Sequence, residues 1–261
     1  MADATSKDDE LAGTEQPFVQ HLMELRDRLL YIIYGITLVF VALAIYPGPS
    51  ALYDLLAMPL VQSLPEGSKM IAVGVVSPFL VPIKVTVMAA CGVALPWILY
   101  QIWAFVAPGL YSHERKLVLP LVASSTILFY MGAAFCYFFV FKQAFPAIQR
   151  MAPISVAVSP DIEVYLDFVI TMFLAFGVAF EVPIVVVILT RMNIFSVAQV
   201  KAFRAYFVVI AAATAGLVTP PDPVSMVALL IPMCLLYEIG IWAAQIFIKH
   251  TQAPVDPIEP T

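Results

Sequence analysis

The sequence predicts an all-α integral membrane protein with six transmembrane helices. Of its 261 residues, 62% are hydrophobic and only 12% are charged, and the mean hydropathy is +0.95. A soluble core of this size could not bury so many apolar side chains. Six runs that are nearly free of charge recur along the chain, most of them close to the roughly 20 residues that cross the hydrocarbon of a bilayer.

Each expected span is a charge-poor run bounded by charged or proline-rich segments. In chain order the runs cover about residues 29–46, 78–100, 117–140, 166–189, 205–218 and 224–248. Lys84 lies one to two turns from the start of the second run, where its long side chain is expected to snorkel to the interface. Glu181 interrupts the fourth run, and Glu238 lies in the sixth.

The six-helix membrane domain is expected over residues 17–248, and the charge of the loops predicts its orientation. An acidic segment, 1–16, is expected to be disordered, shows no signal-peptide pattern, and precedes the domain; a Pro-rich tail, 249–261, follows it. One side of the membrane collects nine basic residues and the other three. The nine are Lys7, Arg26, Arg28, Arg115, Lys116, Arg191, Lys201, Arg204 and Lys249, and the three are Lys69, Lys142 and Arg150. The positive-inside rule therefore predicts that both termini are cytoplasmic.

The two long outer segments, about 47–77 and 141–165, are expected to form an extracytoplasmic cap. The first contains "SALYDLLAMPLVQSLP", whose apolar residues recur at helical spacing and predict a short interfacial helix. The six spans do not divide into two similar halves, as an inverted-repeat transporter would.

The chain shows no sequence signal for an enzyme, a metal site, a cofactor or a nucleic-acid partner. Its three cysteines lie in apolar stretches without CxxC spacing, and "HERKL" lacks the second His of H-E-x-x-H. No G-x-S-x-G, Walker A or dinucleotide motif occurs. Any work on a substrate must therefore be driven by a partner or by the membrane potential, about 2.3 kcal/mol per charge per 100 mV.

Two acids stand on the predicted cytoplasmic side, and each allows two interpretations. Glu24 lies four residues before Arg28 in an amphipathic segment with an apolar stripe, so it could form an i,i+4 ion pair or bind a ligand. Glu114 lies in "APGLYSHERK", near the start of the third span. It could complement the helix dipole, or it could receive cations from a partner.

Glu181 is harder to explain as structure, because an ionised acid near mid-membrane costs about 3 kcal/mol on insertion scales. Pro183 follows two residues later and weakens the helix there, opening a polar notch. A neutral Glu181 bonded to a neighbouring helix is the structural interpretation, and a functional intramembrane acid is the other. Asp222 could cap a helix, and Glu238 could simply pack.

Two other classes of function are compatible with these residues. A proton-coupled secondary transporter would use Glu181 as its proton site. An intramembrane hydrolase would need paired acids or a Ser/His pair at one depth, and only the distant Glu181 and Glu238 are available.

Five segments together resemble the TatC family, the multispanning core of the twin-arginine protein translocase. They are "HLMELRDRLL" at 21–30, "SPFLVPIK" at 77–84, "QIWAFVAPGLYSHERK" at 101–116, "FGVAFEVP" at 176–183 and "TPPD" at 219–222. The resemblance runs from about residue 17 to 248. It implies a concave, glove-like bundle and a receptor for the twin-arginine signal peptides of folded cargo proteins, exported on the protonmotive force.

The resemblance also implies roles for individual residues. Glu24 and Glu114 match the family's signal-binding acids, with Arg26, Phe105, Pro108, Leu110 and Tyr111 around them. Glu181 matches a buried acid that meets a partner helix, with Tyr137 and Pro183 assigned to the same contact. Pro59 and Asp222 match positions of the outer cap. The implied partners are TatA and TatB-type single-span proteins and further copies of the chain, in the cytoplasmic (inner) membrane of a bacterium.

Overall fold

The computed structural model describes residues 5–62, 64, 69–106, 118–150, 159–192, 194–219 and 223–249. Within these ranges the chain is helical apart from turns, short connecting segments and one isolated β-bridge, which pairs Ile71 with Asp161. The predicted all-α class is therefore confirmed.

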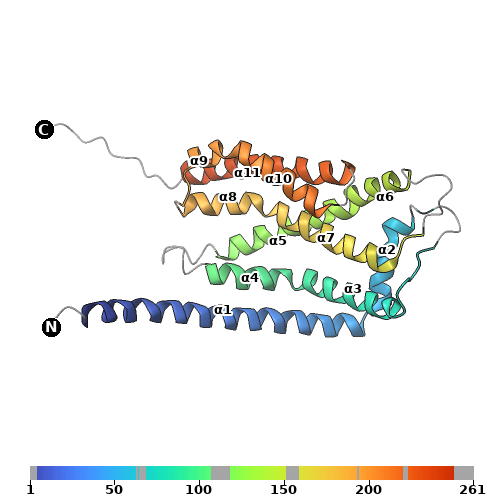
Figure 1. The fold of residues 1–261 in the computed structure, drawn as a ribbon, viewed down its shortest axis with the longest axis horizontal. Helices are drawn as coiled ribbons and strands as arrows, with labels where there is room; N and C mark the ends of the chain where they lie inside the picture. The colour runs from blue at the N-terminus through green and yellow to red at the C-terminus, as the bar shows by residue number, and fades with distance from the viewer. Residues whose placement is uncertain are drawn as a thin grey trace. The chain divides into compact units, whose positions relative to one another are not determined.

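Figure 1 shows the helices of the described chain in their order along the sequence. They are α1 (Thr5–Ile45), α2 (Pro49–Val61), α3 (Ser77–Val93), α4 (Leu95–Val106), α5 (Val118–Phe135), the π-helical turn η3 (Cys136–Val140), α6 (Phe141–Arg150), α7 (Ile162–Phe180), α8 (Val182–Arg191), α9 (Val197–Ala202), α10 (Arg204–Val218) and α11 (Pro223–Lys249). The short helix predicted in the first outer segment is present as α2. The second outer segment begins with α6, which continues the third predicted span.

Four segments of the described chain are long and apolar enough to cross a membrane. They are Val19–Ile45, Leu119–Arg150, Ile162–Arg191 and Ser225–Ile246. The pair α3 and α4, bent by 56°, can form one further broken span. The remaining predicted span corresponds to α10, which is apolar but only 15 residues long. Each predicted run therefore coincides with a helix or a helix pair.

The chain divides into two compact units. The first comprises residues 1–49 and 86–123, and the second comprises residues 50–85 and 124–261. In the first unit α1 packs along α4. The indole N–H of Trp97 donates to the carbonyl of Tyr31 at 2.9 Å, and a Cβ on Gly35 would lie 2.5 Å from the Trp97 ring. Glycine at this position therefore lets the two helices approach closely.

The second unit is built around α11, which lies along α8 and contacts α10, α7 and α9 (Figure 1). One buried cluster joins α8, α9 and α11, and it consists of Val186, Val200, Tyr237, Ile241 and Ala244. A Cβ on Gly240 would lie 2.9 Å from Cα of Pro183. This close approach brings α11 against the start of α8, next to Glu181.

Candidate functional site

Glu24 lies on the face of α1 that packs against α4. Its Oε1 accepts a hydrogen bond from Nη2 of Arg28 at 3.1 Å, and Nη1 of Arg28 donates to Oε1 of Gln101 on α4 at 3.1 Å. The Gln101 side chain is buried, and the Glu24 side chain is 34% exposed. The i,i+4 ion pair is therefore confirmed, and it is tied to the neighbouring helix.

A ring contact extends this face toward the end of α4. The His21 ring stacks on Phe105, with ring centroids 4.3 Å apart. His21, Glu24 and Arg28 recur at helical spacing, so they form one stripe along α1. Glu24 and Phe105 thus both lie where α1 contacts α4, close to the end of α4 at Val106.

The predicted apolar stripe lies on a neighbouring face of α1, and Arg26 lies on the side away from Glu24. Leu22, Leu25 and Leu29 are 40% to 54% exposed. Arg26 pairs with Asp27 beside it, Nη2 to Oδ1 at 2.8 Å, and both side chains are at least half exposed. The polar stripe and not the apolar one packs on α4, so Arg26 is not part of the Glu24 face.

Several predicted site residues lie outside the described residues. They are Pro108, Leu110, Tyr111, Glu114 and Asp222.

Glu181 stands at the break between α7 and α8. Pro183 has no N–H to donate to the carbonyl of Ala179, and the chain makes a turn at Glu181 before α8 begins. Ser125 of α5 hydrogen-bonds the Glu181 carboxyl group. The Oε1 atom of Glu181 is buried and has no hydrogen-bond partner within the described part of the chain. The predicted interruption beside Glu181 is confirmed, and it places a carboxyl oxygen that still needs a partner inside a membrane-spanning segment.

Pro59 and Tyr137 are connected through one carbonyl group. Pro59 lies inside α2 and cannot donate to the carbonyl of Leu55, four residues earlier. The Tyr137 hydroxyl donates to that carbonyl at 3.0 Å. Tyr137 belongs to the π-helical turn η3. The two predicted residues therefore act together: the tyrosine supplies the hydrogen bond that the proline removes, and it holds α2 on η3.

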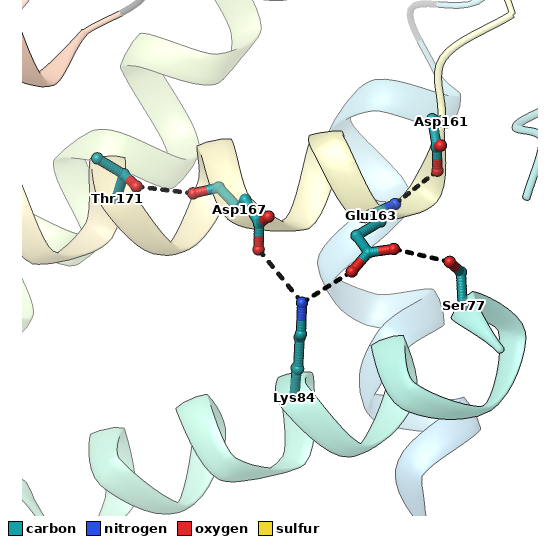
Figure 2. Close-up of polar contacts among 6 residues, drawn as sticks. All are labelled: Ser77, Lys84, Asp161, Glu163, Asp167 and Thr171. Carbon is teal, nitrogen blue, oxygen red and sulfur yellow. Dashed lines mark hydrogen bonds and ion pairs between the residues drawn. The ribbon is translucent and has the colours of Figure 1, made fainter. Parts of the chain in front are cut away.

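The sequence predicted that the Lys84 side chain extends toward the membrane interface. The structure adds that this side chain has specific partners on another helix. Figure 2 shows it reaching α7, where Nζ lies 3.1 Å from Oε1 of Glu163 and 3.7 Å from Oδ1 of Asp167. Sequence reasoning missed both acids. The sequence offered a signal for this contact: two acids one helical turn apart at the start of one apolar run, and a lysine inside another. Charged residues within membrane spans usually pair with one another.

Glu238 also has a specific partner. Nη2 of Arg204, the first residue of α10, donates to Oε2 of Glu238 on α11 at 2.7 Å. Beside it, the Tyr237 hydroxyl donates to the carbonyl of Val200 at 2.8 Å. The Glu238 carboxylate thus joins α10 to α11, and the two acids considered for a hydrolase have separate partners: Glu238 pairs with Arg204, and Ser125 hydrogen-bonds Glu181. No group of three or more His, Cys, Asp or Glu side chains that could hold a metal occurs in the described ranges.

Comparison with known proteins gives a consistent result. The family model described as Sec-independent protein translocase protein (TatC) matches residues 20–232. The TatC protein of Escherichia coli strain K12 is 47% identical over 233 residues, which cover 89% of this chain and 90% of that protein. The TatC protein of Halothiobacillus neapolitanus is 45% identical over 242 residues, 93% of this chain and 66% of that longer relative.

Solved structures show the same likeness. The crystal structure of a twin-arginine translocase receptor, TatC, matches with a TM-score of 0.73 at 35% identity, covering 87% of this chain and 98% of that one. A second structure of that receptor, in DDM, matches with a TM-score of 0.74, covering 86% and 99% of the two chains.

The fold and these comparisons together place the chain among multi-span helical membrane proteins of the protein-translocase class. More specifically, the chain belongs to the TatC family of Sec-independent protein translocase proteins. Its relatives carry the name of a translocase component and not of an enzyme, in agreement with the absence of catalytic motifs from the sequence.

Proposed function

We propose that this chain is the receptor of its translocase and binds twin-arginine signal peptides of folded cargo proteins through Glu24 and Glu114. The observation that carries the proposal is the Glu24 carboxylate, fixed on a membrane protein of this family by Arg28 and, through it, by the buried Gln101. A fixed and partly exposed carboxylate can accept a guanidinium without first being ordered, which lowers the entropic cost of binding.

The chemistry of a carboxylate favours arginine over lysine in the signal. Guanidinium offers a planar fork that can engage a carboxylate through two hydrogen bonds, whereas an ammonium is a more strongly hydrated point charge. Arg28 donates to Oε1 of Glu24, and Oε2 is the second acceptor of the same carboxylate. That oxygen can accept from an incoming guanidinium while Arg28 keeps the side chain in place.

The residues near Glu24 complete the proposed binding surface. The stacked His21 and Phe105 rings offer an aromatic surface for the apolar residues of a signal. Pro108, Leu110, Tyr111 and Glu114 follow directly after α4 in the chain, and they would supply the second acid and further apolar contacts. Arg26, on the other side of α1, is assigned to the edge of this surface and not to its centre.

Glu181 is proposed to meet a polar group on the single helix of a TatA or TatB-type partner. A polar side chain from that helix would satisfy the buried Oε1 atom, and such intramembrane hydrogen bonds are worth about 0.6–2 kcal/mol. Tyr137 and Pro183 support this contact indirectly, since each shapes an irregular turn of the surrounding helices.

The complex would lie in the cytoplasmic membrane, with both termini of this chain in the cytoplasm and α2 on the outer side. The distribution of nine basic residues against three supports this orientation. Several copies of the chain would assemble with the partners, and the protonmotive force would drive export.

Photocrosslinking tests the proposed receptor function. A photoreactive twin-arginine signal peptide is added to membranes that contain the wild type, Glu24→Ala, Glu114→Ala or the control Asp54→Ala, which removes an exposed carboxylate from α2. The crosslink is expected in the wild type and the control only. A crosslink that persists in both acid variants would refute the assignment.

A further inference from the structure

Four side chains link the start of α3 to the start of α7, and they are defined here as the latch: Ser77, Lys84, Glu163 and Asp167 (Figure 2). The Ser77 hydroxyl donates to Oε2 of Glu163 at 2.7 Å, and Nζ of Lys84 donates to Oε1 of the same carboxylate at 3.1 Å. Asp167, one turn further along α7, contributes the longer contact of 3.7 Å. Glu163 is therefore the centre of the latch.

A second attachment lies upstream of the latch. The Ile71 N–H donates to the carbonyl of Pro160 at 3.0 Å, and the Ile162 N–H donates to the carbonyl of Ile71 at 2.9 Å. Asp161 caps the same helix end, since its Oδ1 accepts from the N–H of Glu163 at 2.8 Å. The backbone bridge at Ile71 and the latch therefore both contact the first turn of α7.

Between these two attachments the chain has little other support. Residues 71–76 are exposed, with Val75 at 99%. In the first turn of α3 only Ser77 is buried, whereas Phe79 is 68% exposed. Deep burial of apolar side chains in α3 begins at Val81. We call residues 71–80 the strap.

The first turns of α3 are also intrinsically weak. Pro82 has no N–H to donate to the carbonyl of residue 78, which is itself a proline. A helix start of this kind depends on tertiary contacts more than on its own hydrogen bonds. Here the charged contacts are those of Lys84, whose side chain is 41% exposed, and of Glu163, whose side chain is 40% exposed.

We propose that the latch is a conformational switch that holds the strap closed on α7, and that breaking the ion pair between Lys84 and Glu163 opens residues 71–80 as one unit. The backbone bridge at Ile71 then opens with it, although Ile71 is 13 positions away from Lys84. Because the latch is partly exposed, ions in solution compete for Glu163, so the strap opens more often as ionic strength rises. This switch is separate from signal binding, and its test needs no signal peptide.

Hydrogen exchange measured by mass spectrometry on the full chain in lipid nanodiscs tests the switch. Lys84→Met removes the ammonium and keeps an unbranched side chain. We expect exchange of the strap and of residues 159–163 to become about two- to fivefold faster, the range that corresponds to an exposed ion pair. Wild-type exchange in these peptides should rise with salt, whereas Lys84→Met should show no salt dependence.

Three further variants make the result specific. Lys69→Met removes a lysine just upstream of the strap, and Asp167→Asn removes only the longer contact, so both should exchange like the wild type. The conservative variant Lys84→Arg keeps a cation opposite Glu163 and should retain slow exchange. Unchanged exchange at the bridge in Lys84→Met, or the same increase in Lys69→Met, would overturn the proposal. An increase that spreads through residues 166–176 would also overturn it, because the strap would not be opening by itself.

Discussion

The hydrogen bond between Tyr137 and the Leu55 carbonyl can be tested through the proline that makes it necessary. In Tyr137→Phe that carbonyl loses its hydroxyl donor, and Pro59 cannot replace it. An unsatisfied buried carbonyl costs about 1–3 kcal/mol. Since the Tyr137 contact is exposed, we expect the lower end of that range, about 1 kcal/mol, as a loss in the free energy of unfolding.

If this reasoning is correct, the cost of Tyr137→Phe depends on whether residue 59 is a proline. In Pro59→Ala the new N–H can donate to the Leu55 carbonyl, so the further change Tyr137→Phe should then cost at most a few tenths of a kcal/mol. The free energy of unfolding is measured by SDS titration of the protein in mixed micelles. Tyr165→Phe is the matched control. Its hydroxyl donates to the carbonyl of Leu56 at 2.9 Å, and the residue four positions after Leu56 is Leu60, which has its own N–H. If Tyr137→Phe lowers the free energy of unfolding equally in the wild type and in Pro59→Ala, the reasoning is refuted.

Three further changes follow from the described contacts. Glu181→Ala should leave signal crosslinking intact and weaken copurification of single-span partners severalfold, and unchanged copurification with unchanged export would contradict the role of this acid. Gly240→Val places methyl groups against Pro183 and should lower the free energy of unfolding by about 1–3 kcal/mol, measured by SDS titration, whereas little or no loss would mean that the helices can move apart. Arg204→Ala should cost only about 0.2–1 kcal/mol, because both side chains of its pair with Glu238 are at least 40% exposed, and a larger loss in the same titration would indicate a buried network.

Composition and charge predicted the helical class and the approximate position of each span, because the apolar length needed to cross a bilayer constrains the sequence directly. The breaks within spans were only partly predictable. Pro183 signalled the interruption at Glu181, and Pro96, two residues after Ala94, was an equivalent signal for the 56° bend between α3 and α4 that the prediction did not use. The π-helical turn at Tyr137 depends on packing between segments far apart in the sequence, which a local pattern does not report.

Partners of polar residues were the harder part of the prediction. Spacing correctly predicted the pair of Glu24 with Arg28, since both lie on one helix. The contacts of Lys84 with Glu163 and of Tyr137 with Leu55 join residues 79 and 82 positions apart. Likewise, the sequence predicted an apolar stripe on α1 but did not indicate which face packs on another helix. The polar stripe packs on α4, since in a membrane an apolar face can remain exposed to lipid.

The affinity of signal peptides for the chain tests the central claim most directly. Binding of Arg-Arg and Lys-Lys peptides is measured by fluorescence anisotropy on nanodiscs that contain the wild type, Glu24→Gln or the control Asp54→Asn. The wild type and the control should prefer Arg-Arg by about tenfold, since hydrogen bonds to charged groups are worth about 1.5–3 kcal/mol. In Glu24→Gln that preference should fall severalfold. The same preference in Glu24→Gln as in the wild type would contradict the claim that this carboxylate recognises the arginine pair.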